Sequence, residues 1–275
     1  MIKRILIGLG GTPFTTVGIQ RAVELARQHD ARLKAVTVIN PDQLCKLGPV
    51  PAGAGHYAKK MCENRIEVTQ TQIEESIAVL TERCLQSGVD LSVEQETGDP
   101  FELIINHARY HDLTIFGLRS IFDYRLVNEP EKDLLRLLSK GVRPILAVSD
   151  RFRKIERVMI AYNGSVESAN AMQQFVQMSL WPDAGLDIVQ IGDEHQSSRN
   201  LLEEAAAYCA DHGYAVTIHL QPGSAAQQLL PVSRQVNADM IVMGRGIHSM
   251  LVRRVLGDTV LKTLTNADLP LFLSH

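Results

Sequence analysis

The amino-acid sequence predicts an α/β protein made of two tandem, doubly wound parallel sheets with five strands each. Three observations predict this fold: the chain repeats itself, apolar strand-like runs alternate with helical segments in each copy, and those runs are almost continuously apolar. Parallel strands with helices on both faces have no solvent-facing side, which explains the continuous runs. A length of 275 residues is also near the size at which one hydrophobic core stops growing.

The repeat divides the chain into two domains, residues 1–150 and 155–275, with a linker over residues 149–154. Each copy opens with an apolar strand that closes on a glycine turn, and later strands match as well. The matching pairs are residues 5–11 with 158–164, 112–117 with 239–244, and 143–148 with 269–274.

In the second copy the hydrophobic pattern predicts strands near residues 157–162, 186–191, 215–220, 239–243 and 270–274, with helices near 166–180, 198–212, 225–236 and 257–266. Ser197 or Ser198 can cap the second of these helices and Gly213 can end it, while Gly88 can end the corresponding helix of the first copy. Right-handed crossovers then place helices on both faces of each sheet.

The first copy contains about 26 more residues than the second, because the offset between the copies falls from 153 at the first strand to 127 at the fourth. The surplus lies near residues 41–62, in a Pro- and Gly-rich stretch. We interpret it as a plain insertion, with a surface lid or a dimer contact as alternatives. A long helix follows, and its apolar positions at helical spacing are Ile66, Ile73, Ile77, Leu80 and Cys84.

Composition and charge exclude several classes of partner. With 45% hydrophobic residues, 21% charged residues and a net charge of −3, the chain has the composition of an ordinary globular protein. Lys and Arg occur singly or in pairs, so no nucleic-acid surface is expected. The apolar N-terminal run is too short for a membrane span and lacks the layout of a signal peptide. We therefore expect a cytoplasmic protein without a nucleic-acid or membrane partner.

Neither the cysteines nor the histidines show the spacing of a metal site. Cys45, Cys62, Cys84 and Cys209 form no CxxC pair, which favours reduced structural thiols over a metal or redox site. His107 and His111 stand one helical turn apart, but no third ligand accompanies them in the sequence. No metal site is predicted.

No catalytic constellation emerges either. Gly8, Gly10 and Gly11 lack the spacing of a dinucleotide fingerprint, and no Gly-x-Ser-x-Gly nucleophile elbow is present. The early strand ends also lack the acidic cluster of a response-regulator receiver. Weak ATP hydrolysis ranks last among the functions considered, because no base or metal ligand can be identified for it.

The glycines after the fourth strand of the second copy are the best candidate for a ligand site. In parallel α/β sheets, ligands bind beyond the carboxyl ends of the strands at the switch point. Gly244, Gly246 and Gly257 would let the backbone approach a phosphate. The helix expected to begin near Gly257 adds free amides and a dipole that favours an anion.

This segment resembles the phosphate loop of the universal stress protein family, Gly-x2-Gly-x9-Gly-(Ser/Thr), which precedes the last helix. Twelve residues separate Gly244 from Gly257, as in the family motif, and His248-Ser249 with residues 255–257 look like a variant common in tandem members. The resemblance covers nearly the whole chain, twice over. It implies the universal stress protein fold and binding of ATP or ADP, with Mg²⁺ as an accompanying ion.

The chain departs from the family pattern at three positions. Ile247 stands at the second glycine of the motif, Asp258 stands at the Ser/Thr position, and Asn163 stands where the family has an aspartate that contacts the nucleoside. A carboxylate beside a phosphate would repel it unless a nearby cation compensated.

We expect the ligand in the second domain, in a cleft between residues 161–165 and 244–259. Arg245 and His248 are the candidates for phosphate contact, and Asn163 is the candidate for the base or ribose. The full set of candidate nucleotide-binding residues is Ala161, Tyr162, Asn163, Gly164, Ser165, Ile191, Gly244, Arg245, Gly246, His248, Ser249, Gly257, Asp258 and Thr259.

The first domain lacks such a loop. Its corresponding segment has no later glycine, and Glu129, Pro130 and Glu131 stand where a phosphate would need backbone amides. We interpret this domain as a degenerate structural partner, against the alternative of a site for a different ligand.

Two functions remain open. The first is a stress-response regulatory protein that binds an adenine nucleotide or another small anionic ligand in its second domain. The second is a nucleotide-free interaction scaffold of the same fold. In both, the two last strands, residues 145–148 and 271–273, are expected to pair across a pseudo-twofold axis, because both are short, apolar edges. Monomer and homodimer both remain open.

Overall fold

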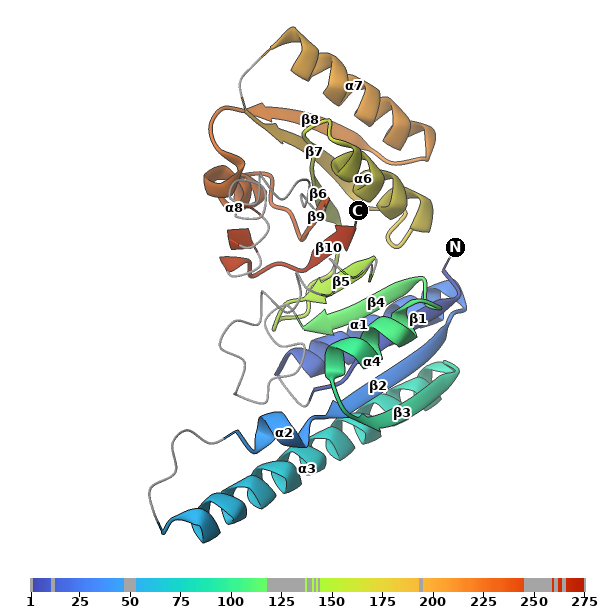
Figure 1. The fold of residues 1–275 in the computed structure, drawn as a ribbon. Helices are drawn as coiled ribbons and strands as arrows, with labels where there is room; N and C mark the ends of the chain where they lie inside the picture. Colours follow the sequence, from blue (N-terminus) through green and yellow to red (C-terminus); the bar gives the residue numbers. More distant parts are fainter. Residues whose placement is uncertain are drawn as a thin grey trace.

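The computed structural model describes residues 2–10, 13–46, 53–117, 137, 140, 142, 144–192, 195–244, 259, 262–263 and 266–274. The described strands form one continuous sheet that runs through the whole molecule, from the long helix α3 (Gly55–Ser87) at one end to helix α7 (Gln196–Asp211) at the other (Figure 1).

Each half of the sheet contributes five strands. The first half consists of β1 (Arg4–Gly8), β2 (Arg32–Ile39), β3 (Leu91–Thr97), β4 (Leu113–Gly117) and β5 (Ile145–Val148); the second consists of β6 (Arg157–Ala161), β7 (Gly185–Ile191), β8 (Val216–Gln221), β9 (Met240–Gly244) and β10 (Leu271–Ser274). The strand order is β3-β2-β1-β4-β5-β10-β9-β6-β7-β8. All pairs within a half are parallel, so the predicted doubly wound fold is confirmed.

The two halves meet at an antiparallel pair of strands. Leu271 stands opposite Ala147, Phe272 opposite Leu146, and Leu273 opposite Ile145. The predicted pairing of the two last strands is therefore confirmed, and it joins the two five-stranded sheets into one. Both strands are buried along their whole length.

Helices cover both faces of this sheet. The remaining described helices are α1 (Pro13–His29), α2 (Pro41–Leu44), α4 (Pro100–Ala108), α6 (Val166–Met178) and α8 (Ala225–Gln235). Apolar side chains of α1, α3, α6 and α7 pack in one cluster, and those of α4 and α8 pack in a second. Because successive side chains of a strand point to opposite faces of the sheet, one strand contributes to both clusters. In β1, Ile5 and Ile7 belong to the first cluster and Leu6 belongs to the second.

The extra residues of the first half form α2 and the beginning of α3. Ile73, Leu80 and Cys84 are buried along α3, at the helical spacing that the sequence predicts. The expectation of four reduced thiols is wrong for two of them, because Cys45 and Cys62 form a disulfide that links the end of α2 to α3. Spacing along the chain could not reveal this pair, since only the fold brings the two residues together.

Helix ends agree with the sequence at two of three positions. Gly88 ends α3 with a left-handed backbone (φ 66°), and Gly213 (φ 90°) follows the end of α7. The predicted serine cap of α7 is wrong: His195 has the extended cap conformation, and Ser198 lies inside the first turn, with its N–H bonded to the His195 carbonyl. Of the predicted last helix, Thr259, Lys262, Thr263 and Asn266 are described, and all four are helical.

Candidate functional site

A cavity lies at the carboxyl ends of β6, the central strand of the second half, and of its neighbour β9. Its volume is about 130 Å³. It is lined by Ala161, Tyr162, Asn163, Ser165, Glu167, Ser168, Val189, Ile191, Ala225, Leu229, Met243, Gly244 and Thr259. This is the position at which a doubly wound sheet binds its ligands, because the strand order reverses here: β7 and β8 lie on one side of β6, and β9 and β10 lie on the other.

The turn after β6 forms the polar wall of the cavity. The Asn163 side-chain oxygen accepts a hydrogen bond from the Ser165 N–H (3.1 Å), and Gly164 between them adopts φ 76°. Ser165 caps helix α6 by accepting from the Ser168 N–H (3.2 Å). The positive end of the α6 dipole therefore lies at the cavity, and Glu167 of the same first turn, which also lines the cavity, already places a carboxylate at this end of the helix.

Gly244 lies at the end of β9, against the first turn of α6. A Cβ atom at this position would lie 2.4 Å from the carbonyl oxygen of Glu167 and 2.7 Å from the backbone nitrogen of Ser168. Glycine is therefore required here by contact between β9 and the first turn of α6. This packing role is independent of any ligand.

Apolar side chains of β7 and α8 form another wall of the cavity. Val189 and Ile191 stand two residues apart on β7 and so share one face of the sheet, and Leu229 reaches them from α8. Val189 and Leu229 are buried, while Ile191 is partly exposed. Burial raises the pKa of the Tyr162 hydroxyl above its ordinary value.

Of the fourteen residues predicted from the sequence, the structure brings seven together around this cavity. They are Ala161, Tyr162, Asn163, Ser165, Ile191, Gly244 and Thr259. Gly164 lies in the adjacent turn and does not line the cavity. Arg245, Gly246, His248, Ser249, Gly257 and Asp258 lie outside the residues that the structure describes, as do Ile247 and residues 129–131 of the first half. Ligand binding by any of these residues remains a prediction.

Sequence reasoning missed six of the lining residues: Glu167, Ser168, Val189, Ala225, Leu229 and Met243. Two signals could have indicated some of them. Val189 shares the strand alternation of Ile191, and Met243 directly precedes Gly244. The α8 residues carried no signal, because the sequence alone does not show how that helix sits over the sheet.

The corresponding place in the first half differs at both strand ends. The positions of Ala161 and Met243 are occupied there by Gly8 and Phe116. The Phe116 ring lies where a Gly8 side chain would extend, with ring carbons 2.7 and 2.8 Å from an ideal Cβ. A buried aromatic ring therefore fills the space between the ends of β1 and β4.

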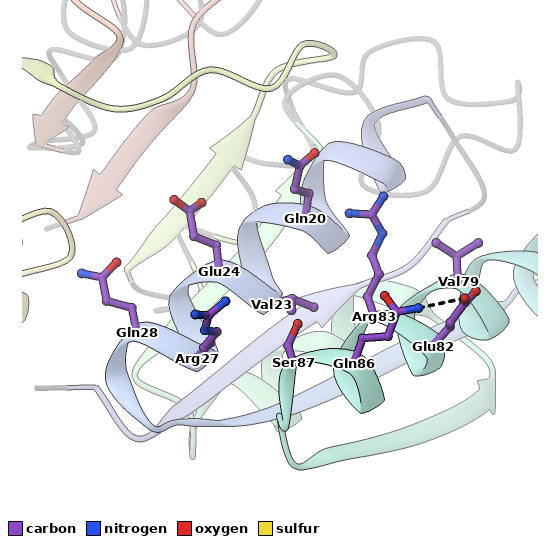
Figure 2. A pocket seen from close by; sticks show the side chains of 10 residues that line it. All are labelled: Gln20, Val23, Glu24, Arg27, Gln28, Val79, Glu82, Arg83, Gln86 and Ser87. Atoms are coloured by element: carbon purple, nitrogen blue, oxygen red, sulfur yellow. Dashed lines mark hydrogen bonds between the residues drawn. The ribbon is translucent and has the colours of Figure 1, made fainter.

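A larger hollow of about 790 Å³ lies between α1 and α3, on the outside of the first half. Long polar side chains from both helices surround it, including Arg27 of α1 and Arg83 of α3 (Figure 2). It lies away from the carboxyl ends of the strands and has few apolar groups. Its size alone does not make it the better candidate, because small-molecule sites combine an apolar wall with a few directed polar groups.

Comparison with known proteins places the chain in a family. The family model described as "Universal stress protein family" matches residues 1–119 and 192–275. The chain belongs to this family. A curated relative, the universal stress protein Slr1230 of a Synechocystis strain, is 21% identical over 283 residues and covers 98% of both chains.

Solved structures show the same fold over the full length. A universal stress protein from Archaeoglobus fulgidus superposes with a TM-score of 0.70 at 19% identity, covering 98% of this chain and 95% of its own. A putative universal stress protein from Pseudomonas aeruginosa superposes with a TM-score of 0.66 at 15% identity, covering 99% of this chain and 93% of its own. At such identities the likeness concerns the fold alone. Among the described residues, no helix has the length and apolar character needed to span a membrane.

Proposed function

We propose that this universal stress protein is a stress-response regulatory protein that binds an adenine nucleotide or another small anionic ligand in its second half. The observation that carries the proposal is the cavity between β6 and β9. There an apolar wall of Val189, Ile191 and Leu229 faces the polar turn at the start of α6. An apolar slot beside a helix N-terminus suits a flat base attached to a charged group.

The volume of the cavity limits what it can hold. About 130 Å³ is below the roughly 300–1,000 Å³ typical of complete ligand sites. We infer that the described walls take the base or a group of similar size. In this proposal the phosphates extend toward residues 245–258, where the sequence carries the family's glycine spacing together with Arg245 and His248. Mg²⁺ would accompany ATP or ADP there.

Equilibrium titration of the purified protein with labelled ATP and ADP tests the proposal. Asp258→Ser restores the family residue and removes a charge beside the expected phosphates, so it should tighten binding by about 1 kcal/mol, roughly fivefold. Gly257→Val and Ile191→Glu should weaken it. Ile218→Glu serves as the control, because Ile218 is an exposed residue of β8 that does not line the cavity. Binding that is equal in all these variants, or absent from all of them, would overturn the proposal.

One observation favours the second function, a nucleotide-free scaffold. The Asn163 side-chain oxygen is already bonded to the Ser165 N–H, so this residue has a turn-forming role without a ligand. If no variant binds nucleotide while the protein remains folded, the scaffold function replaces the first proposal.

A further inference from the structure

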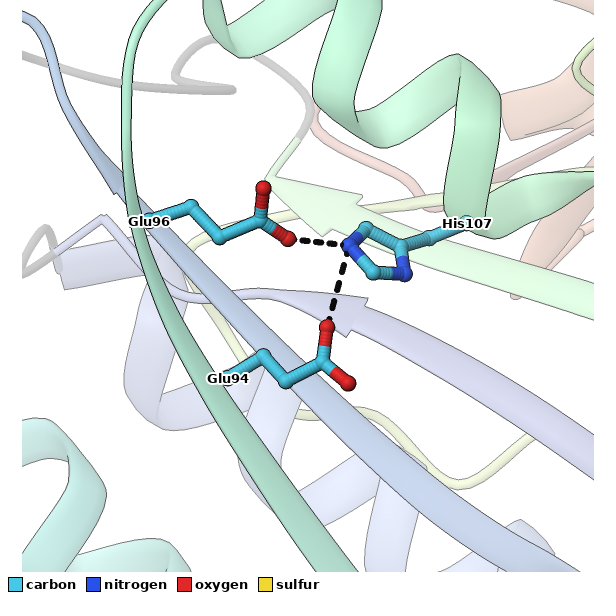
Figure 3. A group of neighbouring side chains, drawn as sticks. All are labelled: Glu94, Glu96 and His107. Carbon is cyan, nitrogen blue, oxygen red and sulfur yellow. Dashed lines mark hydrogen bonds and ion pairs between the residues drawn. The ribbon is translucent and has the colours of Figure 1, made fainter.

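Three side chains of the first half converge on one point away from the cavity. Glu94 and Glu96 stand two residues apart on the edge strand β3 and so share a face, and His107 of α4 packs against that face (Figure 3). One ligand atom from each lies within 4.8 Å of the others. Among the described residues, no other set of three or more His, Cys, Asp or Glu side chains meets this condition.

His107 is one of the two histidines that the sequence places one helical turn apart, but its neighbours in the cluster are Glu94 and Glu96 and not His111. His111 does not join the cluster, because its Nδ1 lies 2.7 Å from the backbone oxygen of His107. The missing ligands come instead from β3, which precedes α4 in the chain. A sequence search for ligands at helical spacing could not find them, since they depend on how the helix packs on the strand.

The geometry places one imidazole nitrogen between two carboxylates. His107 Nε2 lies 3.3 Å from Glu94 Oε2 and also contacts Glu96 Oε1. Donor atoms about 2.1 Å from a tetrahedral zinc ion lie about 3.4 Å from one another. The Glu94–His107 separation therefore already matches that of two ligands, and a small withdrawal of the Glu96 carboxylate would admit the ion.

A lysine orients one of the carboxylates from outside the cluster. Lys34 of β2 donates to Glu94 Oε1 at 2.6 Å, which leaves Glu94 Oε2 directed at His107. Outer hydrogen bonds of this kind hold metal ligands in position. With a neutral imidazole, two carboxylates and one ammonium leave a net charge of about −1 beside the nitrogen lone pair, and a divalent cation would compensate this charge.

We propose that Glu94, Glu96 and His107 form a binding site for a divalent transition-metal ion, zinc in the first instance, which fastens β3 to α4. The imidazole ligand favours such an ion over Mg²⁺ or Ca²⁺, which prefer oxygen ligands alone. Three protein ligands leave a coordination position for water. His107 is only 16% exposed, so its Nε2 is already held where the ion would sit. Without a metal, His107 Nε2 keeps its contacts with the Glu94 and Glu96 carboxylates, as the structure shows.

The experiment is a calorimetric titration of metal-stripped full-length protein with zinc chloride, together with thermal unfolding in its presence. The wild type is compared with Glu96→Gln and His107→Gln, which keep the side-chain shape or polarity but remove a ligand. His219→Gln is the matched control, since His219 Nε2 faces the single carboxylate of Asp187 at 2.7 Å, and Arg157 occupies that carboxylate as well.

We expect the wild type and His219→Gln to bind one zinc ion more tightly, by at least about tenfold, than either cluster variant. Zinc should also raise the melting temperature of those two proteins and not that of the cluster variants. Melting in the absence of metal shows that each variant is folded. Zinc affinity and stoichiometry that are the same in all four proteins would place any zinc elsewhere and overturn the proposal, as would a wild type that binds none.

Discussion

At the scale of single residues, Gly244 is constrained by a backbone contact that leaves no room for a side chain. We expect Gly244→Ala to force β9 and α6 apart and to lower the free energy of unfolding by about 1–3 kcal/mol. Urea unfolding measures the change. Gly185→Ala is the matched control, because the nearest atom to its Cβ would be 3.9 Å away and it should be nearly neutral. Equal effects of the two substitutions would contradict the packing role of Gly244.

His29 makes stability depend on pH. Burial lowers the pKa of His29 below its ordinary value of 6.5, and its Nε2 has no hydrogen-bond partner among the described residues. The unfolded chain therefore binds a proton below pH 6.5 that the folded chain resists. The contribution of neutral His29 to the free energy of unfolding is fully present above pH 6.5. It falls as the pH drops from 6.5 toward the lowered pKa of His29 in the folded protein.

Urea unfolding at pH 7.5, 6.5 and 5.5 checks this expectation. The wild type should lose stability over this range, and His29→Gln, which cannot titrate, should lose less. Burial lowers the pKa of His111 as well. Part of the stability loss at low pH should therefore persist in His29→Gln. An exposed histidine replaced in the same way, His212→Gln, is the control. A pH profile unchanged by His29→Gln would show that His29 does not contribute.

At the scale of the elements, the disulfide between Cys45 and Cys62 ties α2 to α3 and closes the extra segment of the first half. The other two thiols are buried, and burial raises the pKa of Cys84 to about 11 and that of Cys209 to about 12. Thiolates are the reactive form, so both should resist alkylation in the folded state.

Mass spectrometry after native alkylation at pH 7.5 tests this assignment. The oxidised protein should take up no label, and the reduced protein should take up label at Cys45 and Cys62 alone. Denaturation after reduction should expose all four cysteines to the reagent. Labelling at Cys45 or Cys62 before reduction would contradict the disulfide.

At the scale of the whole molecule, the two halves are joined by more than the strand pair. Arg21 of α1 is 2% exposed, and its guanidinium lies over the rings of Phe152 in the linker and Trp181 in the second half, 4.4 and 5.3 Å from their centroids. Gln28 of α1 donates to the Leu180 carbonyl at 2.9 Å. Both apolar clusters also include residues of both halves. The two halves should therefore unfold together.

Substitutions in the central strand pair, β5 and β10, test most directly whether the two halves unfold together. Ile145 and Leu271 are 0% exposed, so Ile145→Lys or Leu271→Lys would bury a charge without a partner and should cost on the order of 3–5 kcal/mol. Calorimetry should show a lower melting temperature and a transition that separates into two. Ile218→Lys at the exposed edge of the sheet is the control. An unchanged melting temperature would contradict the burial of this strand pair.

The sequence by itself determined the repeat, the alternation of strands and helices, and the pairing of the two last strands. These features depend on local apolar patterns and on the need to cover two apolar edges, as residues 145–148 and 271–273 illustrate. It also located the ends of β6 and β9, because a parallel sheet brings the carboxyl ends of its strands together.

Only the tertiary structure decided which side chains meet across elements. It brought Leu229 to the cavity, Phe116 to Gly8, Cys45 to Cys62, and Glu94 and Glu96 to His107. Each of these contacts joins separate elements, and each depends on how a helix or strand end is placed against its neighbour. Periodicity along the chain reports which face of an element is buried; it carries no information about the residue on the other side of the contact.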